Sequence, residues 1–335
     1  MSVLASSRAA EKPASPRRLN PSTDLSAVAD LIEEAFSEDL DQEGRQVLKE
    51  LRQLSNWGVL LWLLRATSPA FEDILSGFVW EEDGHIVGNV SANVTAHVLS
   101  QWRVSNVAIL PAYRRRGIAR HLMEMTIAHI DRKGGRKVYL QVRDENGPAL
   151  RLYKDLDFQS VTAETEMYLP AGSATAPPLD DFQPRPLRRE ESSQVYSLAL
   201  AATSQADQRQ TPPNRSDFEV DWIQQLSDSL TAFTSGRRTY RFVVEGKSEL
   251  AAYAKLTTAR HGGSAHRLSL LVRPDCQGTV ESALIRTVLS TVTQHQGPAE
   301  IQIRLNAGKK GEIAALSALG FVKRRTLITM ELRLD

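Results

Sequence analysis

The segment Asn106-Val-Ala-Ile-Leu-Pro-Ala-Tyr-Arg-Arg-Arg-Gly-Ile-Ala-Arg-His-Leu122 reads as an apolar strand, a basic turn and the start of an amphipathic helix. A helix N-terminus offers unpaired backbone N–H groups and the positive end of the helix dipole, so it favours a bound anion. Gly117 and the small Ala119 let the backbone approach phosphate oxygens closely. Local positive charge comes from Arg114, Arg115, Arg116 and Arg120. The turn therefore predicts a pyrophosphate site, although a bare Gly-x-Ala after arginines is equally typical of a solvated basic helix cap.

A second motif favours the pyrophosphate interpretation. It is Leu140-Gln-Val-Arg-Asp-Glu-Asn-Gly-Pro-Ala-Leu-Arg-Leu-Tyr-Lys-Asp-Leu-Asp-Phe158. The first motif resembles the signature Gln/Arg-x-x-Gly-x-Gly/Ala of the GNAT superfamily of acyltransferases, matched at Arg114, Gly117 and Ala119. The second resembles the pattern Asn-x-x-Ala-x-x-Leu-Tyr-x-x-Leu-Gly-Phe of the same superfamily, matched at Asn146, Ala149, Leu152, Tyr153, Leu156 and Phe158. Asp157 replaces the glycine, and because Asp tolerates left-handed backbone geometry the helix can still end there.

The resemblance covers roughly residues 16 to 170 and is closest to the ribosomal-protein alanine acetyltransferases. It implies acetyl-CoA as cosubstrate, with the backbone of residues 114 to 119 around the pyrophosphate and the strand from Val107 to Ile109 along the pantetheine arm. It also implies that Asn146 contacts the coenzyme and that the Tyr153 hydroxyl lies near the thioester sulfur. The expected coenzyme-binding residues are Val107, Ala108, Ile109, Arg114, Arg115, Arg116, Gly117, Ile118, Ala119, Arg120, Asn146 and Tyr153.

Tyr153 is the expected catalytic residue. Acetyl transfer leaves a thiolate, and a phenol with an ordinary pKa of about 10 can protonate it or donate a hydrogen bond to it. The accepting amine needs a base, because with a pKa of about 10 it arrives mostly protonated. Where the ribosomal-protein enzymes have a glutamate base, this chain has Gln141, which cannot titrate. The base stays open, as does transfer to amine deprotonated in solution; the candidates are Asp144, Glu145, Glu81, His85 and His97.

The acceptor is expected to be a primary amine of a small molecule. In the resembled family the first two helices and their loop line the acceptor pocket. Here that region carries an acidic cluster that could attract a cationic amine or could be a solvated face; it comprises Glu33, Glu34, Glu38, Asp39, Asp41 and Glu43. Apolar walls could come from Trp57, Trp62, Trp80 and Trp102, for which core packing is the simpler role. The alternatives are a protein N-terminus or lysine as acceptor, or a non-catalytic acyl-CoA-binding scaffold.

The order of elements predicts an α/β (α+β) fold of two tandem GNAT domains, each a mixed and mostly antiparallel sheet flanked by helices. In the first half we expect helices over 24–36, 46–54, 117–133 and 148–156, a hairpin of strands 74–80 and 85–95, and strands over 103–110, over 137–142 and near Met167. In the second half we expect helices over 195–201 and 280–292 and one ending at 319–321, a hairpin turning at 245–247, and strands over 267–272, 300–305 and 327–334. The expected domain bounds are a disordered leader 1–15, a coenzyme-binding domain 16–170, a linker 171–180 and a degenerate copy 181–335.

The copy has lost the matching side chains when the halves are aligned on Pro111 and Pro274. Val280 stands where Gly117 stands, and its branched side chain crowds the backbone where phosphate must approach. Leu316 stands in place of Tyr153 and has no proton to give. The other changes are Arg114 to Gln277, Ala119 to Ser282 and Ala149 to Glu312. Cys276 lies in the same turn, and we expect an inert thiol there because no base accompanies it.

Composition excludes several other classes. Lysine and arginine total 41 against 40 aspartate and glutamate, so no overall charge favours nucleic acid or a membrane surface. The longest apolar stretches fall well short of a membrane span, and one cysteine forms no internal disulfide, so we expect a cytoplasmic protein. The seven histidines show no zinc-like spacing, so no metal is expected. The oligomeric state is left open.

Overall fold

The computed structural model describes residues 14–37, 42–55, 76–95, 98–173, 184–203, 208, 213–215, 218, 238–247, 249–258, 265–295 and 299–334. The chain divides into two compact units. Unit 1 is Met1–Val142, Asn146–Val161 and Thr329–Asp335, and unit 2 is Arg143–Glu145 and Thr162–Ile328. Most of the expected leader and linker lie outside the described residues, so the bounds 16–170 and 181–335 stay a prediction. The last residues of the chain belong to the first unit.

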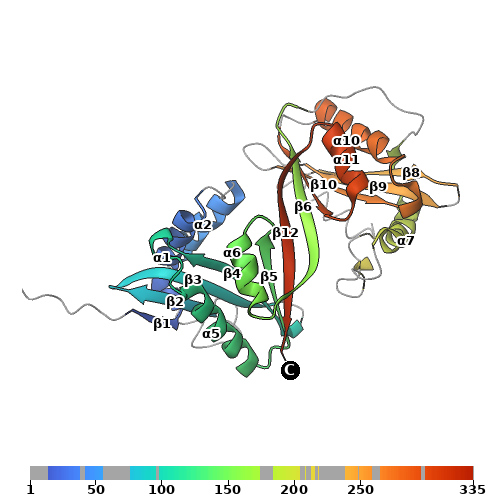
Figure 1. The fold of residues 1–335 in the computed structure, drawn as a ribbon. Coiled ribbons are helices and arrows are strands. Elements are labelled where there is room, and N and C mark those ends of the chain that lie inside the picture. The colour runs from blue at the N-terminus through green and yellow to red at the C-terminus, as the bar shows by residue number, and fades with distance from the viewer. Residues whose placement is uncertain are drawn as a thin grey trace, which may run out of the picture. The chain divides into compact units, whose positions relative to one another are not determined.

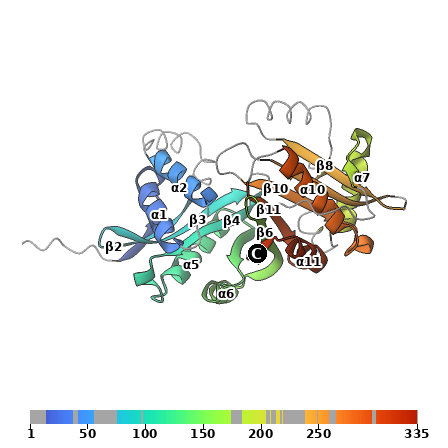
Figure 2. The same cartoon turned by 90° about the horizontal axis from the view of Figure 1, so that it is seen from above.

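Unit 1 is a sheet covered by helices on both faces. Its elements are β1 (Ser15–Arg18), α1 (Pro21–Ala35), α2 (Gln42–Ser55), β2 (Ser76–Glu82), β3 (His85–Thr95), β4 (Val98–Ile109), the 3-10 turn η1 (Pro111–Tyr113), α5 (Ile118–Arg132), β5 (Lys137–Arg143), α6 (Gly147–Lys154) and the start of β6 (Gln159–Leu169). Strands β1 to β4 pair antiparallel in sequence order, and β4 pairs with β5 in parallel. In both views α1 and α2 lie on one side of β2–β4 and α5 lies on the other (Figures 1 and 2).

The local structure of unit 1 follows from its sequence. Helix α1 begins after Asn20, whose side chain accepts a hydrogen bond from the Ser22 N–H at 3.2 Å. The β2–β3 hairpin turns at Asp83 and Gly84, which have φ of +51° and +77°. Such a turn requires residues that tolerate positive φ, so the hairpin predicted from the Asp-Gly pair is confirmed.

The two faces of this sheet have different neighbours. Val79 and Ala108 pack into an apolar cluster with residues of α1 and α2. On the opposite face, a Cβ at Gly88 would lie 2.8 Å from Ile109 Cδ1 and 3.1 Å from Ile118 Cγ2. Glycine at that point therefore lets α5 lie close to β3, which holds the helix start beside the end of β4.

Unit 2 repeats the arrangement. Its elements are β7 (Arg185–Pro186), the 3-10 turn η2 (Arg189–Glu191), α7 (Ser192–Ala202), β8 (Thr239–Glu245), β9 (Leu250–Thr257), β10 (His266–Val272), the 3-10 turn η4 (Pro274–Cys276), α10 (Glu281–His295), β11 (Ile301–Asn306), α11 (Lys310–Ala318) and the first part of β12 (Val322–Arg333). Strands β7 to β10 pair antiparallel in order, β10 pairs with β11 in parallel, and β11 pairs with β6 antiparallel. None of the described helices of either unit is long and apolar enough to cross a membrane.

Alternating residues of β8 face different helices. Phe242 and Val244 belong to the cluster that includes α10 residues, whereas Val243 packs with Val195 and Leu198 of α7. Successive side chains of a strand point to opposite faces, so this sheet also has a helix layer on each side. The predicted mixed, mostly antiparallel α/β fold is confirmed, with the expected helices and strands present in both halves.

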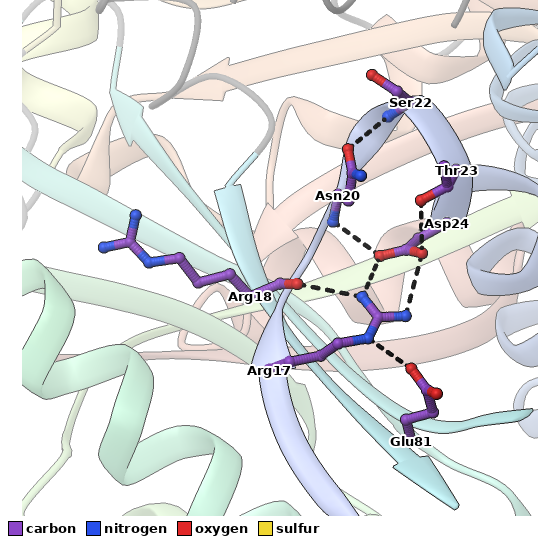
Figure 3. Close-up of polar contacts among 7 residues, drawn as sticks. All are labelled: Arg17, Arg18, Asn20, Ser22, Thr23, Asp24 and Glu81. Atoms are coloured by element: carbon purple, nitrogen blue, oxygen red, sulfur yellow. Dashed lines mark hydrogen bonds and ion pairs between the residues drawn. The ribbon is translucent and has the colours of Figure 1, made fainter. Parts of the chain in front are cut away.

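The same ion-pair network ties the first strand, first helix and second strand together in each unit. Arg17 of β1 binds both carboxylate oxygens of Asp24, at 2.6 and 3.1 Å, and its Nε donates to Glu81 at 2.6 Å (Figure 3). In unit 2, Arg185 binds both oxygens of Glu191, at 2.9 and 2.6 Å, and its Nε donates to Glu245 at 2.8 Å. This repetition of side-chain contacts supports two copies of one layout.

The end of β12 lies beside β5 in unit 1. The Leu334 N–H donates to the Arg136 carbonyl at 2.9 Å, and Lys137 Nζ lies 3.8 Å from the Glu331 carboxylate. Further along β5, Gln141 Nε2 lies 3.4 Å from Thr329 Oγ1. The C-terminal strand thus completes the sheet of unit 1 next to the strand that carries Gln141.

Candidate active site

The basic turn forms a compact bend before α5. After η1, Arg115 and Gly117 take positive φ of +67° and +80°, and α5 starts at Ile118. A Cβ at Gly117 would meet no atom within 4 Å, so glycine is favoured there by backbone conformation and leaves the helix start uncovered. The N–H groups of the first helical turn have no carbonyl partner within the helix and can hold an anion.

Arg114 braces this turn. Its guanidinium donates from Nε to the Ile109 carbonyl at 3.2 Å and from Nη2 to the Ala35 carbonyl at 3.2 Å. It therefore connects the end of β4 with the end of α1. The matched arginine of the motif shapes the turn through these carbonyls, a role that spacing alone did not predict.

Two other arginines of the turn are ion-paired at the surface. Arg116 lies 3.2 Å from Glu82, and Arg120 lies 2.7 Å from Asp155. Exposed pairs of this kind contribute little to stability, so either arginine can exchange its carboxylate for a phosphate at small cost. Arg115 is exposed and sits at the bend itself. All four arginines remain predicted coenzyme contacts.

The strand that precedes the turn has an open side. The parallel ladder between β4 and β5 runs from Gln101–Lys137 to Arg103–Tyr139, although both strands continue beyond it. Backbone groups of the last part of β4, where the predicted pantetheine contacts Val107 and Ile109 lie, are therefore not paired with β5. An extended ligand can add to such an edge as a further strand.

A β-bulge interrupts β4 in this open part, and the strand expected over 103–110 did not include it. Asn89 pairs with Ala108 and Ser91 with Ser105, so Asn106 and Val107 together face a single residue of β3. Asn106 has φ of +51°, a conformation that Asn tolerates better than most residues. The signal was the asparagine inside an otherwise apolar strand pattern.

The bulge turns one peptide group. The Asn106 carbonyl accepts a hydrogen bond from Asn89 Nδ2 at 2.9 Å. The peptide bonds of the described residues are trans, and C=O and N–H of one trans peptide point in opposite directions. The Val107 N–H therefore points away from Asn89, and β5 is the strand on that other side of β4.

The second motif forms α6 as expected. Asn146 Oδ1 accepts from the Ala149 N–H at 3.2 Å, so this side chain caps the helix as well as being a predicted coenzyme contact. Asp157 has φ of +64°, which confirms that it ends the helix segment as glycine would. The Arg120–Asp155 ion pair brings the end of α6 next to the first turn of α5.

Tyr153 lies near the end of α6 and is 6% exposed. Its ring centroid lies 6.0 Å from that of Phe158. Burial disfavours the phenolate and raises the pKa of Tyr153 to about 12. The hydroxyl therefore stays protonated at neutral pH, as a proton donor must.

The candidate bases are spread over the surface. Gln141 is exposed and contacts Thr329, Glu81 is held by Arg17, and Asp144 lies 3.3 Å from Lys323 Nζ. His85 is exposed, with Nδ1 3.0 Å from the Asp83 carbonyl, and Glu145 is exposed. His97 lies outside the described residues. No base is therefore assigned among the described residues of this set.

The predicted acceptor region is only partly described. Glu33 is ion-paired with Arg52, which also binds Asp30 at 2.7 Å, so part of the acidic charge is already compensated. Glu38, Asp39, Asp41, Trp57 and Trp62 lie outside the described residues, as does the side chain of Glu43. Trp102 is 1% exposed and Trp80 is half-buried, which agrees with packing roles for these two rings.

The corresponding turn of unit 2 is closed by a side chain. Gly278 has φ of +83°, like Arg115, and its N–H donates to Glu281 Oε1 at 2.7 Å. Glu281 is 1% exposed, so a buried carboxylate of the chain itself lies in the turn before α10. Val280 and Leu316 are buried, which agrees with their predicted structural roles.

Two further residues of unit 2 were singled out from the sequence. Glu312 is buried next to Lys309, whose Nζ lies 3.5 Å away. Burial raises the pKa of the half-buried Cys276 thiol, as expected for an unreactive cysteine.

Among the described side chains, no group of three or more His, Cys, Asp or Glu could hold a metal ion.

Known proteins resemble this chain in sequence and in fold. Residues 27–158 match the model of the acetyltransferase (GNAT) family. The [ribosomal protein bS18]-alanine N-acetyltransferase of Escherichia coli (strain K12) is 33% identical over 75 residues, which are 22% of this chain and 51% of that protein. The match thus spans about half the length of this curated relative.

Two solved structures resemble nearly the whole chain. A GCN5-related N-acetyltransferase from Sphaerobacter thermophilus has a TM-score of 0.62 at 15% identity, covering 96% of this chain and 95% of that one. A tandem GNAT protein from the clavulanic acid biosynthesis pathway has a TM-score of 0.55 at 15% identity, covering 96% and 98%. At such low identity these two matches show the fold alone.

Proposed function

We propose that unit 1, in which residues 27–158 match the acetyltransferase (GNAT) family, transfers an acetyl group from acetyl-CoA to a primary amine of a small molecule. The proposal rests on one observation: the open edge of β4, the Gly117 turn and the helix of Tyr153 lie next to one another. The open edge of β4 leads into the Gly117 turn, and the helix of Tyr153 ends beside that turn, where Asp155 lies 2.7 Å from Arg120.

The turn and the strand edge suit the two ends of the coenzyme. The first turn of α5 offers N–H groups and the positive helix end to the pyrophosphate, with Arg115, Arg116 and Arg120 adding charge. The pantetheine arm runs along the unpaired side of Val107 to Ile109 and exchanges backbone hydrogen bonds with them. The acetyl thioester then lies beside the bulge at Asn106.

The chemistry divides between one backbone group and one side chain. The Val107 N–H, turned away from β3, donates a hydrogen bond to the acetyl carbonyl oxygen and stabilises the negative charge that develops there. The Tyr153 hydroxyl, whose pKa of about 12 keeps it protonated at neutral pH, gives its proton to the departing thiolate. The proton that the amine nitrogen loses as the amide forms passes through solvent and restores the hydroxyl.

The amine is taken up in its neutral form. No titratable group of the described residues is assigned as its base, and Gln141 cannot act as one. Unit 1 then gains rate by orienting the amine against the thioester, and the neutral fraction comes from solution. The acceptor is then an amine whose pKa is not far above the working pH.

A protein N-terminus is the second candidate acceptor. It is favoured by the relative named as a bS18-alanine N-acetyltransferase, which is 33% identical to this chain over 75 residues. An α-amino group has a pKa of about 8, so it is much less protonated than a lysine and suits a site without a base. Gln141 stands where the ribosomal-protein enzymes are expected to have a glutamate base, so this chain differs from them at that position.

Calorimetric titration of acetyl-CoA tests the site. Gly117→Val is expected to abolish binding, because its branched side chain strains the turn and covers the N–H groups. Gly134→Val is the matched control, since Gly134 lies at the other end of α5 with φ of +77° and equally open surroundings. Equal affinity in both variants would reject the site.

A thiol-release assay tests the reaction and its acceptor. It compares a panel of small primary amines with peptides that have free N-termini. Release driven by small amines supports the proposal, and release driven only by peptides favours the second candidate. Coenzyme binding without release for any acceptor would favour an acyl-CoA-binding scaffold.

A further inference from the structure

Asn89 is a buried polar side chain in an apolar position. It is 0% exposed in the middle of β3, between Val87 and Val90, which are 1% and 0% exposed. A buried amide is unfavourable unless its hydrogen bonds are made, so its partners indicate why the position is not apolar.

Both bonds of this amide serve the bulge. Asn89 Nδ2 donates to the Asn106 carbonyl at 2.9 Å and to Ser91 Oγ at 3.2 Å. Ser91 Oγ in turn lies 3.5 Å from the Asn106 side-chain amide. Asn89 Oδ1 is buried without a hydrogen-bond partner among the described residues. The side chain thus holds the bulge with its donor and leaves its acceptor unsatisfied, which an apolar residue of the same shape would avoid.

We infer that Asn89 is a positioning residue for acyl transfer, acting through the Asn106–Val107 peptide group. This rests on the proposed function of unit 1. Holding the Asn106 carbonyl fixes the plane of that peptide, and so fixes the direction of the Val107 N–H. An oxyanion donor stabilises the transition state only while it is preorganised toward the oxygen. Without the amide, the bulge keeps its place in the strand but loses the bond that orients this peptide.

Asn89→Leu separates positioning from folding. Leucine has nearly the same shape and removes the unsatisfied Oδ1, which offsets the lost hydrogen bond to the part-buried Asn106 carbonyl, so the melting temperature is expected to change little. We expect kcat to fall by about tenfold to a hundredfold, with the dissociation constant for acetyl-CoA within about threefold of the original. A residue with a structural role alone would not produce stable protein with intact coenzyme binding and reduced turnover.

Two companion variants complete the test. Asn89→Ala also removes the donor, and we expect the same loss of kcat together with a lower melting temperature. Val87→Ala is the matched control, since Val87 is a buried β3 side chain outside the site; it is expected to lower the melting temperature and leave kcat unchanged. Hydrogen exchange of residues 104–110 is expected to accelerate in both Asn89 variants and to stay unchanged in the control.

The outcomes separate this inference from the function on which it rests. If the protein without substitutions neither binds acetyl-CoA nor releases thiol, both the proposed function and the role of Asn89 are rejected. If the protein without substitutions is active, two results would overturn the role of Asn89 and leave the proposed function intact. One is a turnover of Asn89→Leu within about twofold of that protein, and the other is unchanged hydrogen exchange of residues 104–110 in Asn89→Leu.

Discussion

Arg17 and Arg185 make the same contacts in the two units. Each guanidinium binds a carboxylate at the first helix and a second one near the end of the neighbouring strand, and each also donates to the carbonyl of the next residue, at 3.2 and 3.1 Å. A buried carboxylate requires such a partner, because an unpaired one is costly to desolvate. The repeated network therefore marks both halves as copies of one layout.

Removing Arg17 is expected to destabilise the protein. Asp24 is 5% exposed, so Arg17→Ala leaves a nearly buried carboxylate with fewer partners and lowers the free energy of unfolding by about 1–3 kcal/mol. Urea unfolding measures this change. Arg52→Ala is the control, because the Asp30 and Glu33 carboxylates are exposed; its effect should stay below about 0.5 kcal/mol. Equal effects would mean that the Arg17 network contributes no more than a surface pair.

Tyr153→Phe is expected to lower turnover by about tenfold to a thousandfold with little change in coenzyme affinity, because only the proton donor is lost and the ring still packs against Phe158. Steady-state thiol release and calorimetry measure the two quantities. Tyr113→Phe serves as control, since Tyr113 lies beside the same turn and its ring contacts Arg116. Turnover preserved in Tyr153→Phe would leave that hydroxyl without a catalytic role.

The pH dependence of kcat/KM is expected to rise toward alkaline pH. Below the pKa of the amine, each unit of pH increases its neutral fraction about tenfold, so the rate rises with a slope near one until the pKa of that amine. The raised pKa of Tyr153, about 12, means that loss of its proton does not reduce the rate below about pH 11. Profiles for two amines of different pKa decide the point. A common inflection near pH 6–7 would instead reveal a base on the enzyme.

One coenzyme is expected to bind per chain. The Gly278 N–H of unit 2 already donates a hydrogen bond to the Glu281 carboxylate. The buried Val280 and Leu316 replace the glycine and tyrosine of unit 1. Calorimetry should therefore give a stoichiometry of one, and Gly117→Val should remove all of it. A second equivalent that survives in that variant would show that unit 2 holds a site of its own.

Deleting the last seven residues is expected to affect unit 1. Thr329–Asp335 belong to that unit, where Glu331 lies beside Lys137 and Tyr139 of β5. A chain that ends at Ile328 should show faster hydrogen exchange in residues 137–143 and weaker acetyl-CoA binding. Exchange that is faster only in 322–328 would mean that the terminal strand stabilises unit 2 alone.

Much of the local structure could be predicted because its causes are local. The Asp83-Gly84 hairpin, the helix after Asn20 and the ending of α6 at Asp157 all depend on backbone conformations that particular residues tolerate. The two motifs of unit 1 likewise depend on short spacings within a strand, a turn and a helix. These features are present in the residues themselves before any long-range contact forms.

The rest depended on contacts between segments distant in sequence. Arg114 stays a predicted coenzyme contact, and its hydrogen bonds to the carbonyls of Ala35 and Ile109 could not be predicted, because these residues become its neighbours only in the folded unit. Asn89 looked like an ordinary strand residue until β3 paired with β4 across a bulge. The Glu281 contact of unit 2 was not predicted. Glu281 follows Val280, which stands in place of Gly117, and only the folded turn brings its carboxylate to the Gly278 N–H.

The sequence by itself determined the order of elements and the two motifs that resemble the GNAT family, because these depend on residue type, periodicity and short spacing. Only the tertiary structure decided which side chains hold the bulge at Asn106, which arginines of the turn are already paired, and that the chain's last strand completes unit 1. The physical reason is that strand register and ion pairing are set by the burial of whole faces, which brings together residues such as Gln141 and Thr329 that are far apart along the chain.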